Sequence, residues 1–157
     1  HADLAREATM FDPSQHDVRR FFCDTQKKRL AREPLSPIEA IASDWIEAHP
    51  EYHALLNNPE HAVNERFDAA DGRGNPFLHL SMHLAITEQL SIDQPPGIRA
   101  AWERLASQSG DPHSAAHQVM ECLGEVLWQA QRTGRPPDGE AYVECLNRRA
   151  STRPATP

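Results

Sequence analysis

Apolar residues recur at intervals of three and four along most of this chain, as they do on the buried face of an α-helix. No stretch of more than a few residues alternates apolar and polar positions as a strand would. The pattern therefore predicts an all-α protein, a compact helical bundle of about six to seven helices. The periodic segments cover residues 12–31, 36–49, 75–92, 97–109, 112–132 and 138–149, and residues 51–67 are only weakly patterned.

Prolines and glycines mark the ends of these segments. The 13 prolines stand mostly at helix starts or between helices, where a residue without an N–H group is tolerated. Ser36 and Glu39 form a capping box around the first-turn Pro37. Gly110 and Gly134 are placed to end the helices before them. We therefore expect short, proline-marked connections.

The composition is that of a single globular domain. Apolar residues make up 39% of the 157 residues and charged residues 25%, far from the pattern of a disordered chain. We expect one all-helical domain over residues 10–149. Residues 1–9 are interpreted as a tag remnant or an extension, and the polar residues 150–157 as a disordered tail.

The segment FLHLSMHLAI, residues 77–86, is apolar except for His79, Ser81 and His83. A helix that is apolar on all sides is typical of a buried position. Four residues correspond to about 40° of rotation and one turn of rise. The imidazoles of His79 and His83 can therefore aim at one point.

Two interpretations of this histidine pair remain open. Burial of an imidazole costs free energy unless its nitrogens find partners, and a shared metal ion would satisfy one nitrogen of each ring. Alternatively, each ring makes hydrogen bonds to a carbonyl, a carboxylate or water, as histidines in a protein core usually do.

A second polar stripe occupies the helix predicted over residues 112–132. His113, His117 and Glu121 follow one another at four-residue intervals. This stripe could face His79 and His83 and complete a site of His and Glu ligands, or it could be solvated surface. Another pair, His49 and His53, straddles Pro50, so these two are interpreted as surface histidines.

The cysteine spacing and the net charge limit the cellular compartment and the kind of partner that we expect. Cys23, Cys122 and Cys145 are widely separated and show no CxxC spacing, which indicates unpaired thiols and a reducing, cytoplasmic compartment. The formal net charge of −7 disfavours a nucleic-acid partner. No apolar run approaches the ~20 residues of a membrane span, and no signal peptide is recognised.

Several catalytic motifs are missing from the sequence. HLSMH has leucine where the HEXXH metalloproteases have their glutamate, and no ExxH pair of the di-iron bundles occurs. Glycine-rich phosphate loops and the GxSxG elbow are also missing, so no nucleotide cofactor is expected. No reaction class is supported.

Four blocks of sequence carry a resemblance to a known family. Over Met10 to Leu146 the chain resembles the bacterial proteins grouped as domain of unknown function 1841, DUF1841. The resemblance implies no activity, substrate or cofactor, because none is established for that family. The blocks are FDPSQHDVRRFF, PLSPIEAIASDWIEAHPEYH, NPFLHLSMHLAITEQLSIDQPPGIR and HQVMECLGEVLWQAQRTGRPPDGEAYVECL.

The leading hypothesis is a cytoplasmic helical-bundle protein that binds iron or zinc. Histidine and carboxylate ligands suit both metals. The competing hypothesis is a metal-free interaction or adaptor protein that binds a protein partner or a second copy of itself through one helical face. The predicted metal ligands are His79, His83, His117, Glu121 and His113.

Overall fold

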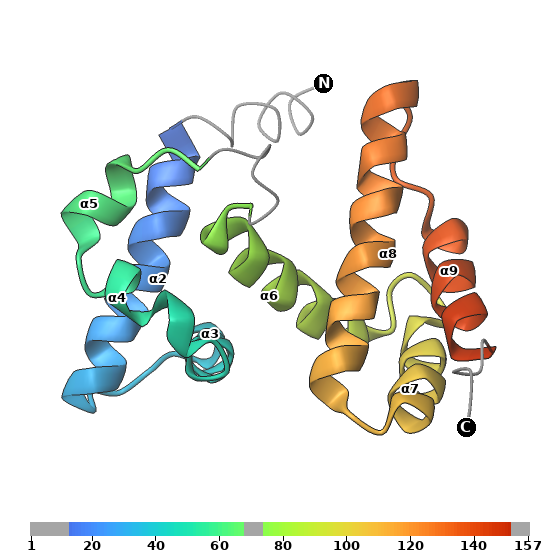
Figure 1. Ribbon diagram of the computed structural model, residues 1–157, viewed down its shortest axis with the longest axis horizontal. Helices are drawn as coiled ribbons and strands as arrows, with labels where there is room; N and C mark the ends of the chain where they lie inside the picture. The colour runs from blue at the N-terminus through green and yellow to red at the C-terminus, as the bar shows by residue number, and fades with distance from the viewer. Residues whose placement is uncertain (1–12, 68–73, 152–157) are drawn as a thin grey trace. The chain divides into compact units, whose positions relative to one another are not determined.

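The computed structural model describes residues 13–67 and 74–151, drawn as ribbon in Figure 1. The described residues form eight α-helices, one 3₁₀-helix and no strand, which confirms the predicted all-α class. Six long helices match the periodic segments, whereas α4 and α5 are short and lie in the weakly patterned stretch. In chain order the elements are α2 Pro13–Ala31, α3 Pro37–Glu47, η1 Pro50–Tyr52, α4 His53–Leu56, α5 Pro59–Asn64, α6 Pro76–Ile92, α7 Ile98–Ser109, α8 Pro112–Thr133 and α9 Gly139–Ser151.

The helices belong to two compact units, residues 1–81 and 82–157, and the boundary falls inside α6. The single domain expected over residues 10–149 stays a prediction. The interpretation of residues 1–9 concerns residues outside the described part of the chain. The helix α9 includes the first two residues of the expected tail, and residues 152–157 are likewise outside the described part.

In the first unit, α2 packs against α3, α4 and α5. The core side chains are fully buried, among them Phe22, Ile46, Leu56 and Phe77. The α2 and α3 helices are also joined by an ion pair between Lys28 Nζ and the Glu39 carboxylate, 2.8 Å apart. The first unit therefore holds an apolar core of its own.

Arg19 of α2 forms hydrogen bonds to the end of α5. Its guanidinium donates hydrogen bonds to the carbonyl oxygens of Ala62, Val63 and Glu65 at 2.9, 3.2 and 2.7 Å. These carbonyls end α5 and have no partner within the helix. The guanidinium carbon also lies 5.1 Å from the centroid of the Phe67 ring. Arg19 is only 4% exposed, so one buried cation satisfies the end of a helix.

The predicted helix boundaries at Ser36, Gly110 and Gly134 are confirmed. Ser36 accepts a hydrogen bond from the Glu39 N–H, and the Glu39 carboxylate accepts one from the Ser36 N–H. Gly110 and Gly134 follow α7 and α8 with φ of 69° and 70°. Glycine adopts this left-handed conformation without the steric cost that other residues bear.

In the second unit, α7, α8 and α9 pack against one another. Their core is apolar and includes the fully buried Ile98, Leu105, Val119 and Leu146. None of the helices in the described ranges combines the length and apolarity needed to cross a bilayer.

A disulfide joins Cys122 of α8 to Cys145 of α9, and Cys23 of α2 is a free, buried thiol. The interpretation of all three cysteines as unpaired thiols is therefore wrong for Cys122 and Cys145. The two residues are 23 positions apart, and sequence spacing detects only motifs whose cysteines are near neighbours. Helix packing brings their Cα atoms to 5.9 Å, within the range of a disulfide.

Candidate metal centre

The helix α6 carries the central histidine pair. The Asn75 side chain caps its start by accepting hydrogen bonds from the N–H groups of Phe77 at 2.8 Å and Leu78 at 3.3 Å. The helix is continuous through residue 92, so His79 and His83 lie one turn apart on one side of it. His83 is 1% exposed and Leu78 is 49% exposed, so α6 is buried on one side rather than all round.

His79 meets a histidine from the end of α3. The Nε2 atoms of His49 and His79 lie 3.1 Å apart, and their rings are nearly perpendicular at a centroid distance of 4.8 Å. His49 is only 2% exposed, so the interpretation of His49 as a surface residue is wrong. Beyond Pro50 the chain continues as the 3₁₀-helix η1, and Tyr52 of this helix stacks on the His49 ring.

The tautomer of His49 follows from its hydrogen bond to the backbone. Its Nδ1 atom is 2.9 Å from the carbonyl oxygen of Trp45. A carbonyl can only accept, so Nδ1 carries the proton and Nε2 presents a lone pair toward His79. A backbone carbonyl on the far ring nitrogen is the usual way in which proteins orient a metal-binding histidine.

Tyr52 covers His49 on one side. Its ring is stacked on the His49 ring, with centroids 5.2 Å apart and planes 6° from parallel, and lies 6.0 Å from the His79 ring. Burial, and next the charge of Glu51, raise the pKa of the Tyr52 hydroxyl above its ordinary value. The two imidazoles therefore have a neutral aromatic neighbour.

His53 contacts the backbone of α3 and, among the described residues, no other histidine ring. Its Nε2 atom is 2.8 Å from the carbonyl oxygen of Ile46, in the last turn of α3. Together with the bond from His49 to Trp45, this contact satisfies two carbonyls at the C-terminal end of that helix. His53 thus acts as a helix cap and makes a matched control for His49.

In the second unit, His83 lies beside His117 of α8. Their ring centroids are 6.1 Å apart, and the His117 ring is in turn 4.5 Å from that of His113, at 76° between planes. Asp111 caps the start of α8 by accepting hydrogen bonds from the His113 N–H at 3.2 Å and the Ser114 hydroxyl at 2.9 Å. This local fold places the predicted residue His117 against α6 and leaves His113 at the exposed first turn.

Glu121, the remaining predicted ligand, is paired with a cation. Its carboxylate forms an ion pair with the guanidinium of Arg149 on α9, and its side chain is 64% exposed. The structure therefore directs Glu121 toward α9, although the sequence places it on the same stripe as His117.

The candidate metal ligands among the described residues are four histidines, His49, His79, His83 and His117. In the first unit, His49 and His79 face each other through their Nε2 atoms. In the second unit, the rings of His83 and His117 have centroids 6.1 Å apart. The helix α6 carries His79 and His83. Nitrogens 3.1 Å apart subtend an angle of about 100° at an ion about 2.0–2.1 Å from each. That angle lies between those of octahedral and tetrahedral coordination.

Residues 14–148, which include all four histidines, match the sequence profile of a domain of unknown function, DUF1841. The chain belongs to the DUF1841 family. The resemblance noted in the sequence is thereby confirmed. Searches of curated proteins and of solved structures found no significant match.

Within this DUF1841 chain, sequence reasoning found three of the four clustered histidines and missed His49. His79 and His83 are recognisable from their spacing in an apolar helix, and His117 from its stripe. His49 belongs to another helix, so no periodicity connects it with α6. The signal available in the sequence was a histidine at the end of an apolar helix and directly before a proline.

Proposed function

We propose that this DUF1841 protein binds one transition-metal ion on α6, through His79 and His83 with His49 and His117 as further ligands. The observation that carries the proposal is the contact between His49 and His79. Two Nε2 atoms face each other at 3.1 Å, and the far nitrogen of His49 is already held by a backbone carbonyl. Glu121 is left out of the ligand set because Arg149 already binds its carboxylate.

Neutral imidazole is a ligand for zinc, iron, copper and nickel alike. The four candidate ligands include no thiolate and no carboxylate, so the set does not favour magnesium or calcium, which take oxygen ligands. We propose zinc or iron. Four imidazoles would complete the tetrahedral shell of a structural zinc, whereas an octahedral iron would keep two positions for water or a substrate.

A metal-free role is the second candidate function. The distance of 3.1 Å between His49 and His79 also fits an N–H···N hydrogen bond. In that case the histidines hold the core together, and the protein acts by binding a protein partner or a second copy of itself. The cytoplasmic location expected from the sequence stays a prediction, although the Cys122–Cys145 disulfide removes one of its premises, that all three cysteines are unpaired.

Metal analysis of untagged protein separates the two candidates. We expect about one equivalent of zinc or iron in the native chain and less than about a tenth of an equivalent in a His79→Ala/His83→Ala double variant. His61→Ala is the control, because this histidine is exposed and pairs with Glu65. Native protein without metal, and with an unchanged melting temperature after chelation, would contradict the proposal.

A titration with Co²⁺ covers the case in which the double variant fails to fold. Native protein from which a chelator has removed the metal should bind one Co²⁺ per chain and develop a visible absorption band. The intensity of this band reports the coordination number, because tetrahedral cobalt absorbs far more strongly than octahedral cobalt. His49→Gln should weaken the band while circular dichroism shows the helix content retained. An unaltered titration curve in His49→Gln would remove His49 from the site.

A further inference from the structure

We propose that the Cys122–Cys145 disulfide exchanges with small thiols that carry a carboxylate, by attack on the Sγ atom of Cys145. This site lies wholly within the second unit, among α7, α8 and α9. It does not depend on metal binding by the histidines.

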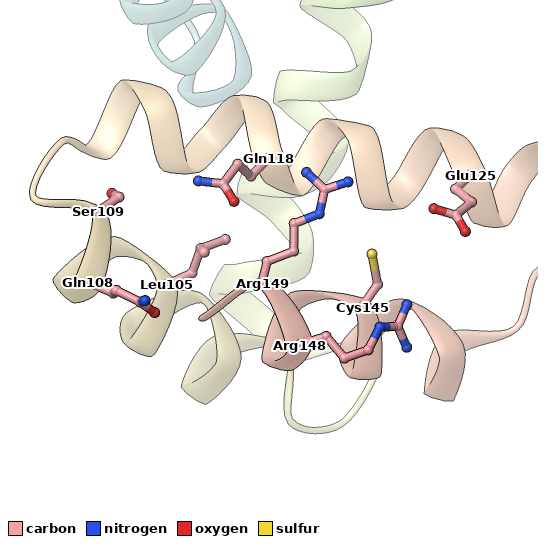
Figure 2. A pocket seen from close by; sticks show the side chains of 8 residues that line it. All are labelled: Leu105, Gln108, Ser109, Gln118, Glu125, Cys145, Arg148 and Arg149. Atoms are coloured by element: carbon pink, nitrogen blue, oxygen red, sulfur yellow. The ribbon is translucent and has the colours of Figure 1, made fainter. Parts of the chain in front are cut away.

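Cys145 is the sulfur that opens to a cavity. A cavity of about 610 Å³ is lined by Cys145 together with residues of α7, α8 and α9. A second cavity, of about 480 Å³, is also lined by Cys145, with Glu125 and Arg148 in both linings. Cys122 is fully buried and lines neither cavity. Cys145 is 5% exposed and borders both cavities, so an incoming thiol would reach Cys145 before Cys122. Figure 2 shows the first cavity with the side chains that line it, Leu105, Gln108, Ser109, Gln118, Glu125, Cys145, Arg148 and Arg149.

Two arginines flank the accessible sulfur. Arg148 and Arg149 follow Cys145 by three and four residues on α9, so all three lie on one side of that helix. In Figure 2 the Cys145 side chain points from α9 toward α8, and the two guanidinium groups lie on either side of it in this view. The lining contains one carboxylate, that of Glu125. Among the side chains that line it, the cavity therefore presents two guanidinium groups and one carboxylate.

Each of the two arginines is paired with a surface carboxylate. Arg149 pairs with Glu121, and Arg148 lies 3.5 Å from the carboxylate of Glu144. Exposed pairs of this kind contribute little stability and rearrange readily. A guanidinium binds a carboxylate through two parallel hydrogen bonds. The cavity therefore favours a thiol with a carboxylate over one with an ammonium group.

The exchange is balanced in atoms and electrons. The thiolate of the small thiol attacks Sγ of Cys145 and forms a new S–S bond, while the bond between Cys145 and Cys122 breaks. Cys122 leaves as a thiolate and takes a proton from water. A second thiolate then attacks the sulfur of the bound small thiol, which releases a small-molecule disulfide and leaves Cys145 as a thiolate beside the two arginines. The small thiol is oxidised, and the protein disulfide is reduced.

The test uses two small thiols of similar size and opposite charge, 3-mercaptopropionate and cysteamine. The protein is a Cys23→Ser variant, in which Cys122 and Cys145 are the only cysteines. Rates of adduct formation are followed by intact mass, and the modified cysteine is located by peptide mapping. We expect the adduct on Cys145. The rate with 3-mercaptopropionate divided by the rate with cysteamine should fall at least about fivefold in Arg148→Gln/Arg149→Gln, because the Coulombic attraction of the anionic thiol to the two arginines is lost.

Comparing this ratio between variants cancels the different reactivities of the two thiols. Arg20→Gln/Lys27→Gln is the control, since it removes two positive charges from exposed positions of α2 and should leave the ratio unchanged. Arg148→Gln alone keeps the pair between Arg149 and Glu121 and should give a smaller fall, which covers the case in which the double variant is unstable. Three results would each overturn the proposal: two free thiols in the purified variant, an adduct on Cys122, or a ratio that does not respond to the loss of Arg148.

Discussion

The Nε2 atoms of His49 and His79 lie 3.1 Å apart, with one histidine at the end of α3 and the other in α6. Two nitrogens at that distance share either one proton or one metal ion. The role of this histidine pair therefore depends on whether a proton or a metal ion lies between the two Nε2 atoms. The carbonyl of Trp45 holds the opposite edge of the His49 ring, so the ring cannot turn its lone pair away without losing a hydrogen bond.

The two histidines that end α3 should respond differently to substitution. His49→Ala removes a proposed metal ligand as well as a helix cap, so it should lower metal affinity by about 10-fold or more. His53→Ala removes only the bond to the Ile46 carbonyl, so it should lower the melting temperature and leave metal content unchanged. Competition with a chromophoric chelator measures the affinity. Equal loss of metal in both variants would show that helix stability, and not ligation, controls metal content.

Arg19 is predicted to be the most sensitive cation of the first unit. Arg19→Ala leaves the carbonyls of Ala62, Val63 and Glu65 without their donor, so it should reduce the free energy of unfolding by about 3 kcal/mol. Arg19→Lys keeps the charge but not the planar fork and should recover only part of that loss. Urea unfolding measures both. Arg20→Ala, one position along at an exposed site, is the matched control, and an equal loss there would refute the role of Arg19.

The cap of α8 should make stability depend on pH. The hydrogen bonds from the Ser114 side chain and then from the His113 backbone lower the pKa of Asp111 below its ordinary value of 3.8. A lowered pKa in the folded state means that the ionised cap stabilises the protein above pH 3.8 and that this contribution is lost as the pH falls through the lower folded value.

Asp111→Asn keeps an acceptor for the His113 N–H but cannot ionise. The difference in urea midpoint between native protein and Asp111→Asn should therefore narrow as the pH is lowered from neutral to below the native pKa of Asp111. A difference that stays constant across that range would exclude the proposed ionisation.

Cys23 should be inert as a thiol in the folded protein. Burial, and next the charge of Asp24, raise its pKa from 9.0 to about 11. At pH 8 the thiolate fraction then falls by about 100-fold, and the thiolate is the reacting species. Iodoacetamide should modify Cys23 at least that much more slowly in native protein than in urea. Mass spectrometry of timed samples measures both rates, and similar rates would contradict the buried, neutral thiol.

The fold was predictable where the cause is local in the sequence. The capping box at Ser36, the glycines after α7 and α8 and the apolar spacing of the long helices are local signals, and the structure confirms each of them. The short helices α4 and α5 were missed because four and six residues are too few to show a period of 3.6.

The candidate site was predictable only in part, for the same reason. A spacing of four residues connects His79 with His83, but nothing local connects either of them with His49. The disulfide between Cys122 and Cys145 also depends on the packing of two helices. Glu121 shares a stripe with His117, yet its carboxylate forms an ion pair with Arg149 on α9, a contact that helical periodicity does not predict.

The end of α3 restricts which side chains can stand at position 49. Cysteine or aspartate there would still offer an atom to a metal ion, but neither would donate a hydrogen bond to the carbonyl of Trp45 as the Nδ1–H of His49 does. A change of metal preference through position 49 would thus also have to replace a hydrogen bond at the end of α3. The identity of this residue is tied to the backbone of its own helix as well as to any ion.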